Sequence, residues 1–161
     1  MFLTLYRSVI RPILDNRNRK WSPIFKRQSV ILENVQRRAT RLLPELECIS
    51  YENRLKILKL PSLKYRRMRG DLIQLFKIIH GIDNISYEDF FNFSHITFTR
   101  GDRYKIFIKR CKSSIRQNSF IFRIVHIWNN LKYDTKSSDS INKFKNAIDR
   151  ELFTLMYEFD E

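Results

Sequence analysis

Glycine and proline are scarce in this chain, with three Gly and four Pro among 161 residues. This scarcity argues against a turn-rich β-sandwich or barrel and favours long helices. The chain has no apolar run near the eighteen or so residues that a membrane-spanning helix needs. So few glycines also exclude a glycine-rich phosphate loop. The sequence therefore predicts a mainly helical domain with no membrane partner.

Cysteine and histidine are too few and too scattered to form a metal site. Cys48 and Cys111 stand far apart in the sequence, and none of the three histidines lies at a ligand spacing from them. This pattern fits neither a disulfide framework nor zinc coordination, so we expect no cofactor. Free cysteines indicate an intracellular protein, and composition does not distinguish nucleus from cytoplasm.

Recognisable catalytic carboxylates are also lacking. Nucleotidyl transfer needs two or more carboxylates that converge on Mg²⁺. The adjacent acid pairs are Glu88-Asp89 and Asp160-Glu161. The first follows Ser86 in the pattern of a capped helix start, where acids are favourable, and the second closes the chain. We expect no enzymatic activity and no small-molecule substrate.

Positive charge is abundant and unevenly distributed along the chain. Lys and Arg number 31 against 17 Asp and Glu, a formal net charge of +14. Residues 1–80 carry a net charge of +12 and residues 81–161 carry +2. Such an imbalance points to a polyanionic partner bound mainly by the first half. Nucleic acid and an anionic membrane surface both fit this charge, and of the two we expect nucleic acid.

Apolar residues recur at helical spacing in most of the chain. The pattern predicts helices over residues 3–14, 26–43, 50–58, 61–81, 114–131 and 140–157, with a bend at Pro12. In the second of these, one apolar stripe is expected to face the core, formed by Ile31, Leu32, Val35, Ala39, Leu42 and Leu43. Gly70, inside the longest helix, predicts close packing or close approach of a ligand.

The middle of the chain has a different pattern. Residues 94–100 and 102–109 alternate partially around Arg100-Gly101-Asp102, which predicts at most one small β-hairpin near residues 95–109. A polar, Ser-rich stretch over 133–140 is typical of a linker. We expect two regions, a basic helical region over 1–81 and a helical region over 82–161, packed together as one unit.

Seven cations on two predicted helices are the candidate phosphate contacts. They are Arg37, Arg38, Arg41, Lys64, Arg66, Arg67 and Arg69. The alternative is a solvated helix face whose cations pair with Glu33, Glu45, Glu47 and Asp71. Most aromatic residues fall at core positions, among them Trp128 and Phe120 on the apolar stripe of their helix. Trp21 and Tyr65 are less settled, and no aromatic residue is assigned to base stacking.

Five groups of motifs follow one another in order along residues 4–149. The longest single stretch is Ile31-Leu32-Glu33-Asn34-Val35-Gln36-Arg37-Arg38-Ala39-Thr40-Arg41-Leu42. The others are Leu5–Pro12 with Trp21-Ser22-Pro23, Ser50–Leu55 with Leu60–Leu63, Tyr65–Leu72 with Lys77–Gly81, and Thr99-Arg100-Gly101 with Phe120, Arg123, Val125, Trp128–Leu131 and Phe144-Lys145. Together they resemble the region downstream of the polymerase core in non-LTR (LINE-type, jockey-like) retrotransposon reverse transcriptases. Lys132 departs from the pattern, because the family usually has Pro there.

The resemblance implies a thumb-like region over 1–81 that holds template–primer duplex, either RNA–DNA or DNA, by its phosphates. The family's catalytic Asp-Asp motif lies upstream of this region, in the palm. The chain is therefore expected to be a C-terminal remnant of an RNA-directed DNA polymerase, inactive alone, with the palm and fingers as a further partner. Two alternatives stay open: a helical protein-interaction module, and a decayed transposon fragment with no function.

Overall fold

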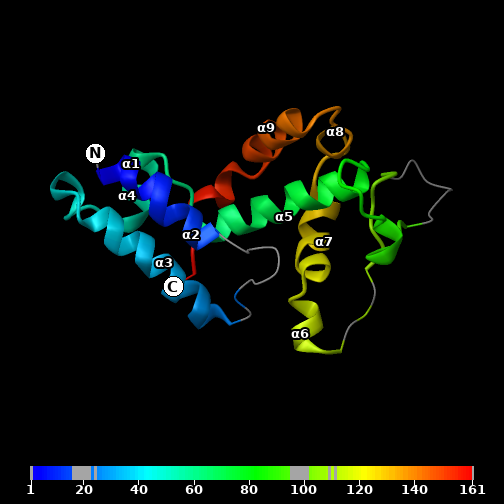
Figure 1. Cartoon of the computed structure of the whole chain (residues 1–161), viewed down its shortest axis with the longest axis horizontal. Helices are drawn as coiled ribbons and strands as arrows, with labels where there is room; N and C mark the ends of the chain where they lie inside the picture. Colours follow the sequence, from blue (N-terminus) through cyan, green and yellow to red (C-terminus); the bar gives the residue numbers. More distant parts are fainter. Residues whose placement is uncertain are drawn as a thin grey trace. The chain divides into compact units, whose positions relative to one another are not determined.

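The computed structural model describes residues 2–15, 23, 25–94, 102–108, 110 and 112–160. These residues form helices joined by short turns (Figure 1), which confirms the expected mainly helical fold. The described part of the chain contains no β-strand, and a single antiparallel bridge joins Phe93 to Ile106. Among the described helices, none combines the length and the apolar character needed to cross a bilayer.

The chain divides into two compact units. Unit 1 comprises Met1–Met68 and Thr154–Glu161, and unit 2 comprises Arg69–Phe153. The division falls inside helix α5 (Leu63–Ile79), whereas the sequence suggested a boundary at residue 81. Unit 1 also contains α1 (Phe2–Leu5), α2 (Arg11–Asp15), α3 (Lys26–Arg41) and α4 (Tyr51–Leu58). A 3₁₀ helix over Pro44–Leu46 links α3 to α4.

The first predicted helix is interrupted by a wide turn. A π-helical turn over Tyr6–Ile10 separates α1 from α2, and the Arg11 N–H donates to the Tyr6 carbonyl oxygen. Proline lacks an N–H and crowds the carbonyl four residues before it, which accounts for an irregular turn directly ahead of Pro12. The wide turn shifts the register, so Tyr6 and Arg11 are buried while Val9 is exposed.

The core of unit 1 is small and partly aromatic. It is formed by Tyr6, Ala39, Tyr51, Leu55 and Leu60, with Leu3, Ile10, Leu58, Tyr157 and Phe159 packed around it. Helices α1, α3 and α4 and the turn over Tyr6–Ile10 contribute to this cluster, and the three helices lie close together in Figure 1. The backbone N–H of Ser62 donates to the Met156 carbonyl oxygen at 3.0 Å. The C-terminal segment is thereby fixed to the start of α5.

Unit 2 is built around the second part of α5. It contains a 3₁₀ helix over Tyr87–Asp89, α6 (Ser114–Gln117), α7 (Phe120–Asn130), α8 (Tyr133–Lys136) and α9 (Ile141–Glu151). Helix α7 runs across α5 (Figure 1). Phe76 stacks on Phe144 with ring centroids 4.2 Å apart, and Trp128 is fully buried beside them.

Two local expectations for unit 2 need correction, and a third falls outside the described residues. The stretch 133–140 is not a linker, because it forms α8 and buries Thr135 and Lys136. The helix expected over 114–131 is broken between α6 and α7 at Asn118-Ser119. Residues 95–101 of the expected hairpin, including its turn, lie outside the described residues, as do Trp21 and Cys111.

The predicted helix ends agree with local backbone chemistry. The Tyr65 N–H donates to the Ser62 hydroxyl oxygen at the start of α5, and the Lys143 N–H donates to the Ser140 hydroxyl oxygen at the start of α9. Gly81 has a φ of +64° after α5, the left-handed conformation that glycine adopts without strain. Short polar side chains and one glycine therefore set these boundaries.

Candidate nucleic-acid interface

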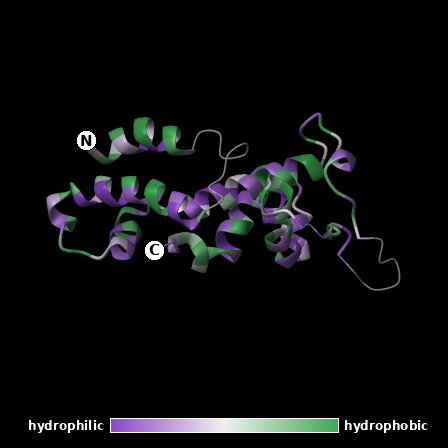
Figure 2. Cartoon of the chain, turned by 90° about the horizontal axis from the view of Figure 1, so that it is seen from below, coloured by the Kyte–Doolittle hydropathy of each residue, from purple (hydrophilic) through white to green (hydrophobic). Residues whose placement is uncertain are grey.

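The buried face of α3 is polar rather than apolar. Its buried residues are Ser29, Glu33, Gln36, Ala39 and Thr40. Ile31, Val35 and Leu42 are 57%, 39% and 70% exposed, so the expectation that they face the core is wrong. Apolar residues, drawn in green, recur along α3 in Figure 2. Unit 1 therefore presents an α3 surface that mixes apolar and basic side chains.

A chain of hydrogen bonds explains the polar burial of α3. The Tyr6 hydroxyl donates to Gln36 Oε1 at 2.8 Å. Gln36 Nε2 donates to the Tyr51 hydroxyl oxygen and to the Pro61 carbonyl oxygen, each at 3.2 Å. The Tyr51 hydroxyl in turn donates to Glu33 Oε1 at 2.7 Å. Since buried polar groups are stable only when paired, this network fixes the orientation of α3.

Glu33 provides the carboxylate of this network, and its side chain is buried. Desolvation raises its pKa above 4.5, although hydrogen bonds from Tyr51 and from the Leu63 N–H, and the charge of Arg67, oppose the rise. Burial, and then the nearby Glu33 carboxylate, raise the pKa of the Tyr51 hydroxyl. The Tyr51 hydroxyl therefore keeps its proton and remains the donor to Glu33.

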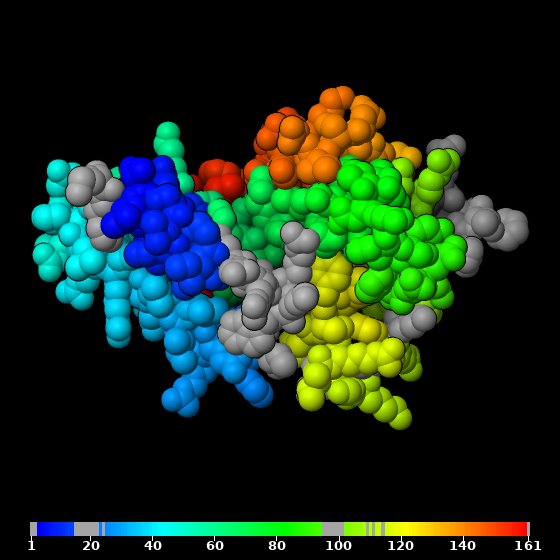
Figure 3. Space-filling model, in the orientation of Figure 1, coloured from blue at the N-terminus to red at the C-terminus, as the bar shows by residue number. Residues whose placement is uncertain are grey.

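Two of the seven predicted contacts, Arg38 and Arg41, are exposed on α3. Neither forms an ion pair within the described part of the chain. Arg27 is also exposed and without an ion pair there, and it precedes Arg38 by eleven residues, about three helical turns. The helical spacing could have identified Arg27 from the sequence. Long side chains of the α3 segment project from the surface in Figure 3.

Lys64 and Arg67, on the first turns of α5, are held within unit 1. Lys64 pairs with Asp160 at 2.7 Å. Desolvation would raise the pKa of Asp160, but hydrogen bonds from Lys64 and Ser29 and the charges of Lys64 and Lys26 outweigh it and lower that pKa. Arg67 is buried, and its Nη2 donates to the Ser29 hydroxyl oxygen at 2.9 Å. Arg66 is half-buried.

Arg69 belongs to unit 2 and makes a two-pronged ion pair. Its Nε and Nη2 donate to the two carboxylate oxygens of Asp149 at 2.6 and 2.8 Å. Asp71 receives the same kind of pair from Arg123, at 2.7 and 2.9 Å. Asp71 is thus bound to α7, and Glu33 is bound to Tyr51 and Leu63. The alternative of a solvated face therefore applies only in part. Lys64 and Arg69 pair with Asp160 and Asp149, which were not expected, whereas the charge of Arg67 acts on Glu33, which was.

Arg37 and Arg54 lie against the same aromatic ring. The Arg37 guanidinium carbon is 5.1 Å from the centroid of Tyr51 and 5.4 Å from that of Phe159. The Arg54 guanidinium carbon is 5.6 Å from the Tyr51 centroid. Sequence reasoning missed Arg54. The available signal was its position three residues after Tyr51 and one before Leu55, on the buried face of α4.

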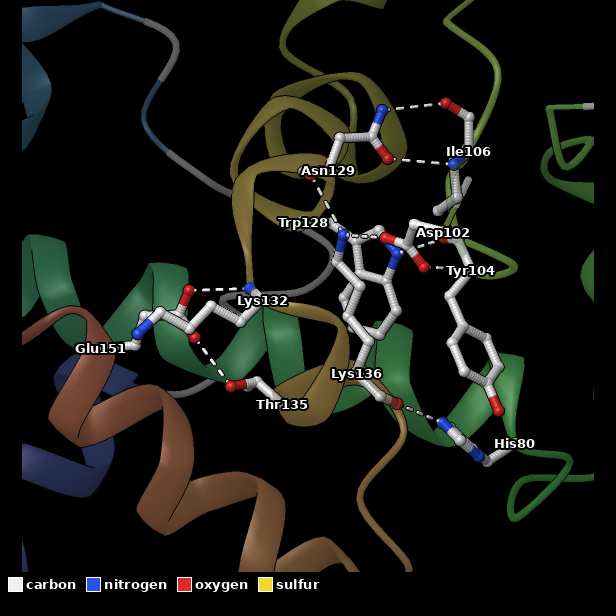
Figure 4. Close-up of polar contacts among 10 residues, drawn as sticks. All are labelled: His80, Asp102, Tyr104, Ile106, Trp128, Asn129, Lys132, Thr135, Lys136 and Glu151. Carbon is white, nitrogen blue, oxygen red and sulfur yellow. Dashed lines mark hydrogen bonds and ion pairs between the residues drawn. The ribbon is translucent and has the colours of Figure 1, made fainter. Parts of the chain in front are cut away.

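In unit 2, the side chains of two neighbouring residues of α7, Trp128 and Asn129, form hydrogen bonds with the backbone of residues 104 and 106. Trp128 Nε1 donates to the Tyr104 carbonyl oxygen at 2.8 Å. Asn129 accepts from the Ile106 N–H and donates to the Ile106 carbonyl oxygen, both at 2.9 Å (Figure 4). The amide of Asn129 therefore pairs with residue 106 as a neighbouring strand would. Trp128, predicted to be a core residue, has this structural role.

The turn after α7 is fixed by a second set of contacts (Figure 4). The Lys132 N–H donates to Glu151 Oε1 at 2.8 Å, and the Thr135 hydroxyl donates to Glu151 Oε2 at 2.7 Å. Proline at position 132 could not make the first bond, so Glu151 explains how Lys132 is accommodated. Buried Lys136 pairs with Asp102 and donates to the Asn129 carbonyl oxygen.

No cluster of three or more His, Cys, Asp or Glu side chains that could hold a metal occurs among the described residues. Comparison with protein-family models, curated proteins and solved structures found no match to this chain.

Proposed function

We propose that this chain binds the phosphate backbone of RNA–DNA or DNA duplex through α3 of unit 1. The observation that carries the proposal is the exposed set Arg27, Arg38 and Arg41, three cations on one helix that form no ion pair with described residues. Each phosphate that an arginine neutralises releases counterions, which favours binding. Contacts of this kind carry no base information, so little sequence preference is expected.

The resemblance to the thumb region of retrotransposon reverse transcriptases supports the same proposal. In that role the chain holds the duplex and performs no nucleotidyl transfer by itself. The basic residues of α5 contribute differently from those of α3. Arg67 fastens α5 to α3 through Ser29, and Arg69 is neutralised by Asp149. Arg67 and Arg69 therefore stabilise the fold, and we do not assign phosphate contacts to them.

The test is a salt titration of duplex binding by fluorescence anisotropy. We expect the triple variant Arg27→Gln, Arg38→Gln, Arg41→Gln to bind all duplex sequences more weakly. The slope of log affinity against log salt should flatten by about one unit per lost contact. The matched control removes the same number of charges at ion-paired lysines, with Lys56→Gln, Lys77→Gln and Lys143→Gln. Equal losses in both variants would point to net charge alone and contradict an α3 site.

A second candidate function is a helical protein-interaction module, and the exposed Ile31, Val35 and Leu42 favour it. Apolar side chains in a row on a helix are typical of surfaces that bind other proteins. If the triple arginine variant binds duplex like the parent, the nucleic-acid proposal fails and this candidate replaces it. Sedimentation of the variant Ile31→Ser, Val35→Ser, Leu42→Ser would then report whether this surface mediates association.

A further inference from the structure

Arg54 is a buried cation whose hydrogen-bonding capacity is not used. Its side chain lies on the inner face of α4, and the residue is only 5% exposed. The Nε and Nη1 atoms are buried and have no hydrogen-bond partner among the described residues. Burial of charged N–H groups without partners is strongly unfavourable, since they lose their water and gain nothing in exchange. Such a group indicates a place for an acceptor.

The surroundings of Arg54 are cationic. Desolvation lowers the pKa of Arg54, the positive charges of Arg41 and Arg37 lower it further, and Tyr51 opposes them. Arginine nevertheless remains charged at physiological pH. The guanidinium groups of Arg37 and Arg41 on α3 therefore repel that of Arg54 on α4.

The aromatic contact does not satisfy these donors. Tyr51 lies against the guanidinium groups of Arg37 and Arg54, and its hydroxyl is already engaged with Glu33 and Gln36. A ring face attracts a cation but accepts no bond from the N–H groups in the guanidinium plane. The Nε atom of Arg37 is likewise buried without a partner in the described residues. Two neighbouring side chains thus have unused, charged donors.

We propose that Arg54, together with Arg37 and Arg41, forms a binding site for one phosphate group, with Nε and Nη1 of Arg54 as the inner donors. The planar fork of a guanidinium matches two oxygens of a phosphate, and the anion offsets the mutual repulsion of the three cations. Arg41 is exposed and Arg37 is half-buried, so both long side chains can move to admit the anion. The phosphate comes either from a nucleic-acid backbone or from free phosphate.

Thermal unfolding with inorganic phosphate tests the site directly. We expect phosphate to raise the Tm of the parent chain above that in sodium chloride of equal ionic strength, because a ligand of the folded state stabilises it. Arg54→Met should abolish this shift. It should not lower the Tm without phosphate, since it removes a buried charge that has no partner. Arg54→Lys, which keeps the charge but loses the fork, should weaken phosphate binding by about tenfold.

A parent chain with no phosphate-specific shift, or an Arg54→Met variant that keeps the shift, would overturn the site. Duplex binding by Arg54→Lys identifies the source of the phosphate. If Arg54→Lys weakens the binding of both inorganic phosphate and duplex, the site exists and takes a phosphate of the nucleic-acid backbone. If it weakens the binding of inorganic phosphate alone, the site exists and takes free phosphate. The inference rests on the proposed function only for the backbone source. A parent chain that binds phosphate but no duplex would refute the proposed function and leave the site intact.

Discussion

At the scale of single residues, burial in unit 1 is decided by polar pairing. Gln36 is completely buried, although an amide at this depth is stable only when its donors and acceptor are engaged. Tyr6, Tyr51 and the Pro61 carbonyl group provide those partners. Glu33, next to them, accepts from Tyr51 and Leu63. These residues therefore specify how α3 is oriented.

The raised pKa of Glu33 gives a prediction about stability and pH. Because the folded state holds this proton more tightly than the unfolded state, Glu33 stabilises the fold below its ordinary pKa of 4.5. This contribution to the free energy of unfolding is lost as the pH rises from 4.5 through the raised pKa that Glu33 has in the folded chain. We therefore expect Glu33→Gln, which mimics the protonated form, to become progressively more stable relative to the parent chain over that rise.

Urea unfolding of both chains at a series of pH values measures this difference. The variant Glu45→Gln, at an exposed position of the same unit, controls for the loss of one surface charge. A stability difference between Glu33→Gln and the parent that stays constant with pH, or that moves the other way, would contradict the role of desolvation at Glu33.

At the scale of helices, α5 contains one glycine in its interior and is followed by another. Gly70 was expected to allow close packing, but a Cβ atom built there meets no heavy atom of the described chain within 4 Å. The packing explanation is therefore wrong. Gly81 also has open space around it, but its positive φ imposes a different constraint. The two glycines can be compared directly, because both have room for a Cβ atom and only Gly81 has a positive φ.

Alanine at these two positions should have opposite effects. Gly70→Ala should stabilise the chain by about 0.5–1 kcal/mol, because alanine restricts the unfolded chain and favours the helix. Gly81→Ala should destabilise it by about 1–2 kcal/mol, because a Cβ is disfavoured in the left-handed region. Urea denaturation of the two variants provides the measurement. Destabilisation by Gly70→Ala would show that a contact or a strained turn at α5 had been overlooked.

At the scale of the whole molecule, positive charge is shared between the two units. Unit 1 contains sixteen Lys and Arg against eight Asp and Glu, a net charge of +8, and unit 2 carries the remaining +6. The net charges of the two units therefore differ much less than those of residues 1–80 and 81–161, which are +12 and +2. The acidic C-terminal segment Thr154–Glu161 belongs to unit 1, and Asp160 neutralises Lys64 there. The exposed arginines of α3 therefore form part of the positively charged surface of unit 1.

Purified chain should show no primer extension on any template with Mg²⁺ or Mn²⁺. Nucleotidyl transfer depends on carboxylates that hold two metals. Asp160 pairs with Lys64, and the described residues contain no cluster of three or more His, Cys, Asp or Glu side chains that could hold a metal. Incorporation of labelled nucleotide above a no-protein control would refute this prediction. A parallel reaction with a known polymerase establishes that template and primer are competent.

The sequence by itself determined where most helices form, because helix formation depends on local spacing, capping residues and glycine. Ser62, Ser140 and Gly81 lie at the predicted ends of the helices over 61–81 and 140–157, and the apolar residues Leu72, Leu75 and Phe76 of α5 are buried. It also identified Trp128 as a core residue.

Only the tertiary structure decided which face of α3 is buried and which cations stay available. Periodicity assigns the apolar side of a helix to the core, but partners distant in sequence, such as Tyr6 and Leu63, can satisfy the polar side instead. The same holds for charge. Arg67 and Arg69 are held by Ser29 and Asp149, which lie 38 and 80 residues away from them, whereas Arg38 is exposed on α3. Sequence-local reasoning does not contain these long-range pairings, and they determine the candidate interface.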